Sequence, residues 1–225
     1  MKDFTVIIPA RRNSKSIPFK NRQKVNGLTI VEHTIKFSEE INAKRIILST
    51  DDEFYLDNPK YSKFVLNRPP HLATDEAIIS DVILQIIEVE KLEEEFILLL
   101  EPTSLPRYKH QLNQFFNGDF ENSKARSLAS FCKSPLIKEK IWTCHNDQLV
   151  PDPEIWKRRQ DYPDQFILTG HYFGFYGKDV KKYYPGLCDE KVFPIMIKDK
   201  FSDINTYAEL NQLRCILNEE ENNNE

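Results

Sequence analysis

Long apolar runs are missing from this sequence. No stretch of its 225 residues approaches the roughly 20 consecutive apolar residues of a membrane-spanning helix. The run of apolar residues and threonine near the amino terminus ends at Pro9, which leaves it too short for the apolar region of a secretory signal peptide. We therefore expect a soluble, cytoplasmic protein.

Cysteines with metal-binding or redox spacing are missing as well. The four cysteines are Cys132, Cys144, Cys188 and Cys215, and no two of them form a C-x-x-C pair. Neither a zinc knuckle nor a redox motif is therefore indicated. Because a chain of this length can bury a sizeable core without disulfides, we predict reduced thiols.

The third absence is an excess of basic residues. With 31 Lys plus Arg against 35 Asp plus Glu, the formal net charge is 31 − 35 = −4, and the isoelectric point is about 5.8. A general nucleic-acid binder normally has a basic excess. A disordered acidic chain is excluded in turn, because 40% of the residues are hydrophobic and 12% are aromatic. The composition favours one folded domain, which we place at residues 1–217.

The first half of the chain alternates between two kinds of apolar pattern. Strand-like runs occupy residues 4–8, 45–50 and 96–100, and patterns with helical spacing occupy residues 30–41 and 78–87 between them. The strand-like run at residues 96–100 is apolar throughout, as expected for a strand covered on both faces. Strands and helices that alternate in this way predict a parallel α/β sheet.

The second half is more irregular. Strand-like runs at residues 127–131, 166–176 and 192–197 are predicted to complete the sheet, with an inserted region at about 132–190. A final helix over residues 206–218 is predicted to begin with a capping box formed by Thr206 and Glu209. The polar, acidic tail at residues 218–225 is predicted to be disordered.

Basic residues are concentrated directly after the first strand. Residues 1–24 contain seven basic side chains and one acidic side chain, Asp3. Ligands of open α/β sheets bind at the carboxyl ends of the strands, where cations beside backbone N–H groups suit a polyphosphate. A solvated surface loop explains the charge cluster equally well. The loop has no glycine, so it is not a Walker phosphate loop.

Six motifs in this sequence resemble those of the acylneuraminate cytidylyltransferases, the CMP-sialic-acid-synthetase-like enzymes. They occur in the order of that family and cover most of the chain. The motifs are IIPARRNSKSIPFKN at residues 7–21, STDD at 49–52, RP and LATD between 68 and 75, EPTSLPR at 101–107, RRQDYP at 158–163 and DINT at 203–206.

This resemblance implies a Rossmann-like, mostly parallel sheet with helices on both faces and an inserted dimerisation element, and hence a homodimer. It implies an enzyme that transfers CMP from CTP to the anomeric hydroxyl of a nonulosonic acid sugar and releases pyrophosphate. It also implies Mg²⁺ as a cofactor, with Asp203 as a ligand of the metal. Asp203 and the metal together would help to remove the proton from the attacking sugar hydroxyl.

The resemblance assigns roles to residues in the matched motifs. Arg11, Ser14, Lys15 and Lys20 would hold the triphosphate, with Arg11, Lys15 and Asp203 as the catalytic residues. The cytosine or ribose would lie near Asn21, Arg68, Ala73 and Thr74. The sugar side would be formed by Glu101, Thr103, Ser104 and Arg107, together with Arg159 and Gln160 from the inserted region.

Departures from the family pattern lie mainly on the sugar and metal sides. Ser16 replaces a glycine, Glu101 replaces a glutamine and Asn205 replaces an aspartate, while the phosphate loop keeps its cations. A carboxylate at Glu101 would repel an acidic sugar. We therefore predict an active cytidylyltransferase with an unusual acceptor. A nucleotidyltransferase for another ulosonic acid, or a non-catalytic CTP-binding homologue, remain as alternatives.

Several motif residues also have plain structural interpretations. Asp51 and Asp52 are predicted to cap the next helix, and Asn205 is as well explained by a cap as by a metal site. Thr103 and Ser104 equally suit a turn after the strand. Tyr172, Phe173, Phe175 and Tyr176 are predicted to be core and dimer contacts, with platforms for ligand stacking as the alternative. Histidines 71, 110, 145 and 171 show no metal-ligand spacing and are predicted to be structural.

Overall fold

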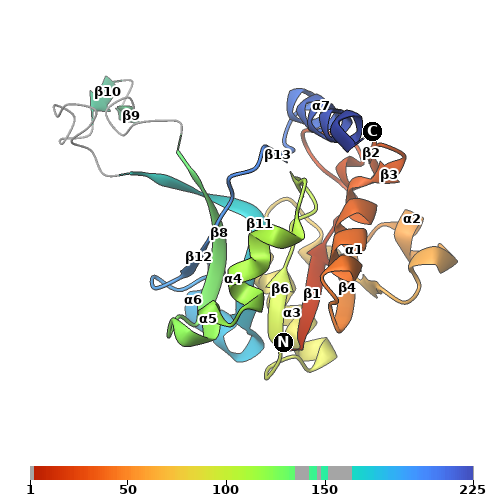
Figure 1. Cartoon of the computed structure of the whole chain (residues 1–225). Helices are drawn as coiled ribbons and strands as arrows, with labels where there is room; N and C mark the ends of the chain where they lie inside the picture. Colours follow the sequence, from red (N-terminus) through yellow and green to blue (C-terminus); the bar gives the residue numbers. More distant parts are fainter. Residues whose placement is uncertain (1–2, 135–141, 146–147, 152–163, 225) are drawn as a thin grey trace.

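A seven-stranded sheet organises the computed structural model, which describes residues 3–134, 142–145, 148–151 and 164–224. Four neighbouring strands run parallel, β12 lies parallel to β8, and β11 is antiparallel to both of its neighbours. The prediction of a mostly parallel α/β sheet is confirmed (Figure 1). In spatial order the strands are β12 (Phe193–Met196), β8 (Ser127–Lys133), β11 (Phe166–Tyr176), β6 (Phe96–Leu99), β1 (Phe4–Pro9), β4 (Arg45–Thr50) and β5 (Val65–Asn67).

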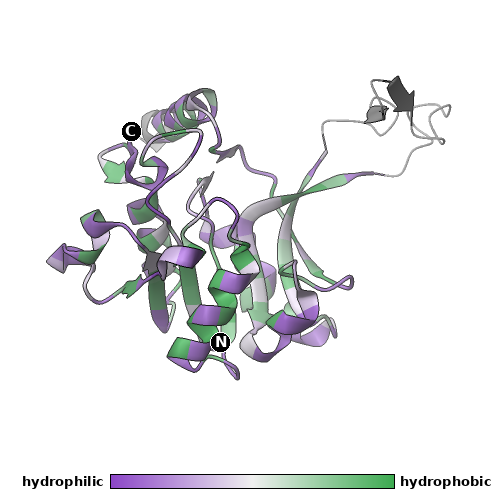
Figure 2. Cartoon of the chain, turned by 180° about the vertical axis from the view of Figure 1, so that it is seen from behind, coloured by the Kyte–Doolittle hydropathy of each residue, from purple (hydrophilic) through white to green (hydrophobic). Residues whose placement is uncertain are grey.

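Helices cover both faces of this sheet, as predicted. Helices α1 (Ile30–Glu40), α4 (Asn113–Phe116) and α5 (Asp119–Asn122) pack on one face, and α3 (Ile79–Glu90) and α6 (Val180–Tyr183) pack on the other. Strand β1 shows why its sequence is apolar without alternation, since Val6 and Ile8 enter one core and Ile7 enters the other. In Figure 2 the central strands are accordingly mostly hydrophobic, while the helices carry both hydrophobic and hydrophilic residues.

The remaining elements are mostly short connections at the edges of the sheet. Three two-stranded ladders pair β2 with β3, β7 with β13 and β9 with β10. Their bounds are β2 (Lys24–Val25), β3 (Leu28–Thr29), β7 (Ser104–Leu105), β9 (Trp142–His145), β10 (Gln148–Pro151) and β13 (Ser202–Asp203). The helices not yet named are α2 (Glu53–Leu56), α7 (Tyr207–Asn224) and the 3-10 turns η1 (Lys20–Arg22), η2 (Pro59–Tyr61), η3 (Pro70–Leu72), η4 (Lys109–Leu112) and η7 (Gly177–Asp179).

A third, smaller core joins the basic loop to the end of the chain. Ile17 and Val25 of the loop region pack with Leu105, Ile204 and Leu210. These residues come from segments as far apart as residues 17 and 210, so their contacts are purely tertiary. The small core brings the loop after β1 next to β7, β13 and α7. Figure 1 shows β13 and α7 above the carboxyl end of β1.

Two boundary predictions need correction. Helix α7 continues to Asn224, so the tail predicted to be disordered is helical up to that residue. Strand β11 pairs with β6 and β8 in the main sheet, so the inserted region is shorter than residues 132–190. The capping box of α7 is confirmed, because the Thr206 N–H donates to Glu209 Oε2 at 2.7 Å and the Glu209 N–H donates to Thr206 Oγ1 at 3.3 Å.

Among the described residues, no helix is both long enough and apolar enough to cross a membrane.

Candidate functional site

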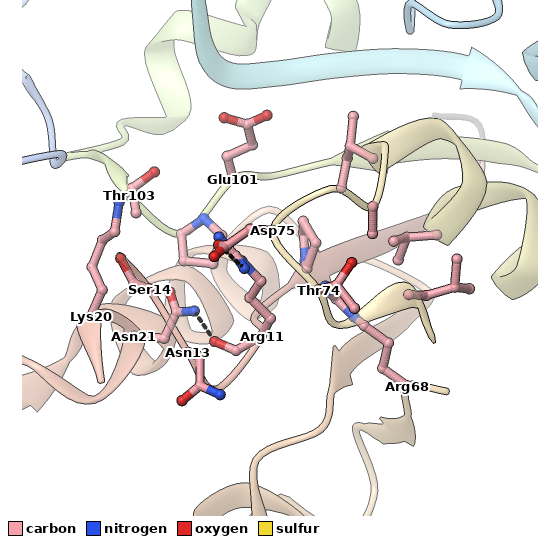
Figure 3. A pocket seen from close by; sticks show the side chains of 16 residues that line it. Arg11, Asn13, Ser14, Lys20, Asn21, Arg68, Thr74, Asp75, Glu101 and Thr103 are labelled. Atoms are coloured by element: carbon pink, nitrogen blue, oxygen red, sulfur yellow. Dashed lines mark hydrogen bonds and ion pairs between the residues drawn. The ribbon is translucent and has the colours of Figure 1, made fainter. Parts of the chain in front are cut away.

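A cavity of about 260 Å³ opens where the loop after β1 faces the loop after β6 (Figure 3). It lies at the carboxyl ends of these parallel strands, the edge where open α/β sheets bind ligands. Eight residues predicted from the motifs line it: Arg11, Ser14, Lys20, Asn21, Arg68, Thr74, Glu101 and Thr103. The structure therefore gathers the predicted phosphate, nucleoside and sugar residues around one space.

Hydrogen bonds between side chains and the backbone hold the basic loop in place. The Asn21 amide donates to the Arg11 carbonyl oxygen at 2.9 Å, and the Arg12 N–H donates to Asp51 Oδ1 at 2.7 Å. Asp51 therefore anchors the loop and does not cap α2, whereas Asp52 does cap it by accepting from the Phe54 N–H at 3.1 Å. The left-handed residue of the loop is Phe19 (φ 49°), so Ser16 does not need the freedom of a glycine.

The loop cations differ in how far they enter the cavity. Lys20 lines the cavity and its Nζ donates to the Ile204 carbonyl oxygen at 2.8 Å; burial lowers its pKa although Asp203 opposes that shift. The Arg11 side chain is about 31% exposed and lines the cavity. Lys15 is 75% exposed and lies outside the lining, so its predicted contact with phosphate would need its long side chain to move.

An acidic residue that the motif analysis did not assign to the site pairs with these cations. Asp75 Oδ1 lies 2.5 Å from Arg11 Nη1, and Asp75 Oδ2 lies 3.4 Å from Lys15 Nζ. Both pairs lower the pKa of the Asp75 carboxyl, the Arg11 hydrogen bond contributing most. The sequence signal for Asp75 as a site residue is its place in the LATD motif. A motif does not show which partner a carboxylate has, so the ion pairs could not be predicted.

Arg68, predicted to lie near the cytosine or ribose, is hydrogen-bonded to strand β4 of the sheet. It is 4% exposed, and its guanidinium donates to the Ser49 carbonyl oxygen at 2.9 Å and to Ser49 Oγ at 3.2 Å. Burial lowers its pKa to about 10, so it remains charged at neutral pH. Thr74 lines the cavity, whereas the adjacent Ala73 is not part of the lining.

Among the residues predicted to face the sugar, Glu101 lines the cavity and has its carboxyl group in a mostly buried position. Burial, with a smaller contribution from the negative charge of Asp203, raises its pKa to about 7. Gly170 makes room for this side chain, since a Cβ there would overlap the Glu101 carboxyl and lie 2.6 Å from Ser104 Oγ. Below neutral pH the group is largely protonated, so the predicted repulsion of an acidic sugar applies only at higher pH.

Arg107 and Ser104 do not line the cavity, which corrects their predicted placement. Arg107 is 7% exposed, and its guanidinium donates to the carbonyl oxygens of His171 (3.1 Å) and Glu101 and to Thr34 Oγ1 (3.3 Å). It therefore fixes the backbone behind Glu101. Burial lowers the pKa of Arg107 to about 10, so it too stays charged.

Asp203 stands beside the cavity, not in its lining. Its Oδ1 faces the hydroxyls of Ser104 at 3.3 Å and Thr103 at 3.4 Å, and its Oδ2 accepts from the Asn205 amide at 3.1 Å. Asp203 is thus a specific partner of both hydroxyls. The turn predicted for Thr103 and Ser104 is also present, since the Ser104 N–H donates to the Glu101 carbonyl oxygen. Within the described part of the chain, no three His, Cys, Asp or Glu side chains form a ready-made metal cluster.

Other assignments have mixed outcomes. Tyr172, Phe173 and Phe175 are at most 6% exposed and belong to the cores, as one of their two interpretations predicted. His171 is buried with no hydrogen-bond partner on Nε2, and burial lowers its pKa to about 3. The predictions for Arg159 and Gln160 fall outside the described residues.

Comparison with known protein sequences identifies the first half of the chain. Residues 5–100 match the family model described as cytidylyltransferase. The N-acylneuraminate cytidylyltransferase of Streptococcus agalactiae serotype V is 33% identical over 108 residues, which are 46% of this chain and 26% of that protein. The 3-deoxy-manno-octulosonate cytidylyltransferase of Alteromonas mediterranea is 40% identical over 50 residues, 22% of this chain and 20% of that protein. The matches thus cover about a quarter of the length of these relatives.

Solved structures share the fold over nearly the whole chain. A CMP:2-keto-3-deoxy-manno-octonic acid synthetase complexed with CTP superposes with a TM-score of 0.69 at 13% identity, covering 97% of this chain and all (100%) of that one. A UTP-bound UDP-glucose pyrophosphorylase from Acinetobacter baumannii gives 0.64 at 14% identity, covering 96% and 93% of the two chains. The comparisons therefore agree with the resemblance indicated by the motifs: residues 5–100 match the cytidylyltransferase family model, and the whole chain shares its fold with these solved structures.

Proposed function

We propose that this protein transfers CMP from CTP to the anomeric hydroxyl of a nonulosonic, sialic-acid-like sugar and releases pyrophosphate. The observation that carries the proposal is that Arg11, Lys20, Glu101 and Thr103 line the same cavity. Cations on one wall suit a triphosphate, and oxygen groups on the other suit a sugar hydroxyl. The cytidylyltransferase match of residues 5–100 supports CTP as the nucleotide.

The reaction is an in-line displacement at phosphorus. The sugar hydroxyl oxygen bonds to the α-phosphorus of CTP while the bond from that phosphorus to the oxygen leading to the β-phosphate breaks. Pyrophosphate leaves with that oxygen, and the hydroxyl proton is released. Negative charge grows on the phosphoryl oxygens and the leaving group, so the placed charges of Arg11 and Lys20 stabilise the transition state.

Asp203 fits the requirements of a magnesium site in part. Mg²⁺ is usually bound by one or two carboxylates together with phosphate oxygens and water, and Asp203 offers such a carboxylate beside the Thr103 and Ser104 hydroxyls. When bound, Mg²⁺ would neutralise phosphate charge and help to loosen the proton of the attacking hydroxyl. Asn205, where the family has an aspartate, contributes an amide that orients Asp203.

The acceptor is best tested as a choice between two sugar acids. Pyrophosphate release would be measured with CTP, Mg²⁺ and either N-acetylneuraminic acid or 3-deoxy-manno-octulosonic acid, with the other three nucleoside triphosphates as competitors. The match to the Alteromonas mediterranea enzyme is the reason for the second acid. No turnover with any acceptor, despite binding of CTP, would refute the proposed activity and favour a non-catalytic CTP-binding protein.

Glu101 provides a second test on the sugar side. We expect Glu101→Gln to change the relative rates with the two acids, and more strongly at pH 8 than at pH 6, because the wild-type group carries its charge mainly above its pKa of about 7. Unchanged relative rates at both pH values would remove Glu101 from acceptor recognition.

A homodimer is proposed on a different surface. Phe166, Ile167 and Leu168 are 50%, 43% and 48% exposed at the start of β11, where this strand and β8 extend away from the rest of the sheet (Figure 2). Three consecutive exposed apolar residues suit burial against a second copy of the chain. Ile167→Asp should then lower the mass measured by light scattering from dimer to monomer, and an unchanged mass would exclude this surface.

A further inference from the structure

The carboxylate of Asp75 occupies the cationic wall of the cavity. It lies within 2.5 Å of Arg11 Nη1 and 3.4 Å of Lys15 Nζ, and it is part of the cavity lining (Figure 3). Two cations on the same loop thus share one carboxylate. A phosphate oxygen that approached these cations would meet the same two partners.

The local structure gives Asp75 no competing role. It lies in the irregular segment between η3 and α3, at residues 73–78. The N-cap position of α3 is Ile78, and no side chain caps that helix end. The two ion pairs are the contacts that the structure assigns to the Asp75 carboxylate, whose side chain is 28% exposed and therefore open to exchange with solvent or ligand.

We propose that Asp75 is a displaceable counter-ion of the phosphate loop, which lowers the affinity of the site for polyphosphate and returns to Arg11 and Lys15 when pyrophosphate leaves. This inference rests on the proposed function only in that the cavity binds a triphosphate. It adds a residue that controls binding and release without contacting the reacting atoms.

The physical argument is competition between one tethered anion and a more highly charged mobile one. The tethered carboxylate is always close to the loop, so it acts at a high effective concentration. A triphosphate replaces it because it brings several negative charges and more acceptor oxygens. A partly exposed ion pair is weak, so removing both pairs should tighten polyphosphate binding only modestly, roughly three- to tenfold.

The test is calorimetric titration of the full chain with sodium tripolyphosphate and with sodium pyrophosphate in EDTA. We expect Asp75→Asn to bind both roughly three- to tenfold more tightly than wild type. Asp75→Glu keeps the charge and should remain closer to wild type. The matched control is Glu76→Gln, which removes one negative charge from the next residue, outside the cavity lining, and should change binding less than about twofold.

The opposite result has a clear meaning. If Asp75 instead holds Arg11 in its binding position, Asp75→Asn would bind both anions more weakly, and equal or weaker binding overturns the inference. Absence of binding to wild type and variant alike also overturns it, because the loop would then not be a polyphosphate site. Tighter binding by Asp75→Asn without turnover on any sugar would leave this inference standing while the proposed transferase activity fails.

Discussion

The two walls of the cavity use their charged groups in different ways. On the wall proposed to bind phosphate, Arg11 is partly exposed and, with the largely exposed Lys15 outside the lining, pairs with the accessible carboxylate of Asp75. On the wall proposed to face the sugar, Glu101 lines the cavity in a mostly buried position, and behind it Arg107 is buried and donates to backbone carbonyl oxygens. The Arg11 wall can therefore exchange its bound anion, whereas the Glu101 wall is held in place by buried hydrogen bonds.

This difference shows that charge type alone does not define a ligand contact. Both arginines lie in motifs of the same family, yet Arg11 points into the cavity and Arg107 supports the backbone behind it. Substitutions on the exchangeable wall should therefore change activity at nearly constant stability. Substitutions on the fixed wall should change stability as well.

The largest effect is expected from Arg11→Ala. Removing a cation that stabilises transition-state charge should lower kcat/KM on the order of 10²-fold, with little change in unfolding midpoint. Lys15→Ala should lose less, because its amine is 75% exposed and lies outside the cavity lining. Lys24→Ala, which removes another cation of the same basic segment outside the lining, is the control in the pyrophosphate-release assay. Near-wild-type turnover by Arg11→Ala would refute the phosphate role of the loop.

Arg107→Ala should have the largest effect on stability. It leaves buried carbonyl oxygens of Glu101 and His171 without their donor, which should lower the free energy of unfolding by about 3 kcal/mol. Urea unfolding measures this. The comparison is Arg45→Ala, which breaks a surface pair with Glu90 and should cost less than about 1 kcal/mol. An equal loss of unfolding free energy in the two variants would mean that Arg107 contributes no more to stability than a surface ion pair.

Glu101→Gln should alter the pH dependence of stability. The pKa of the folded group, about 7, lies above its usual value, so the folded state holds the proton more tightly than the unfolded state. Wild type therefore loses stability as pH rises through about 7, whereas the glutamine variant lacks this loss. Between pH 5 and 8 the variant should gain roughly 2 kcal/mol relative to wild type in EDTA. A pH-independent difference in unfolding free energy would show that Glu101 is not held in a buried, protonated form.

The smallest effect is expected from Asn205→Asp, which restores the carboxylate of the family pattern. Losing the amide that donates to Asp203 should cost about 1 kcal/mol without metal. Added MgCl₂ should raise the melting temperature of this variant more than that of wild type, because two carboxylates bind the ion better than one. Asn205→Ala controls for loss of the amide. If magnesium affects all three proteins equally, Asp203 is not a metal site.

Much of the fold could be predicted from local patterns. The bounds of β4 and β11 match the predicted runs, and the capping box at Thr206 is present. These features depend on neighbours within a few residues, which the sequence displays directly. The antiparallel direction of β11 and its place between β8 and β6 depend on pairing across the sheet, so periodicity could not reveal them.

By itself the sequence determined which cations follow the first strand and which family motifs surround them. Only the fold places Arg107 behind the cavity, pairs Asp75 with Arg11, and holds Glu101 in a mostly buried position against Gly170. The physical reason is that a side chain's charge is written in the sequence, whereas its partner, burial and pKa depend on segments far away in the chain.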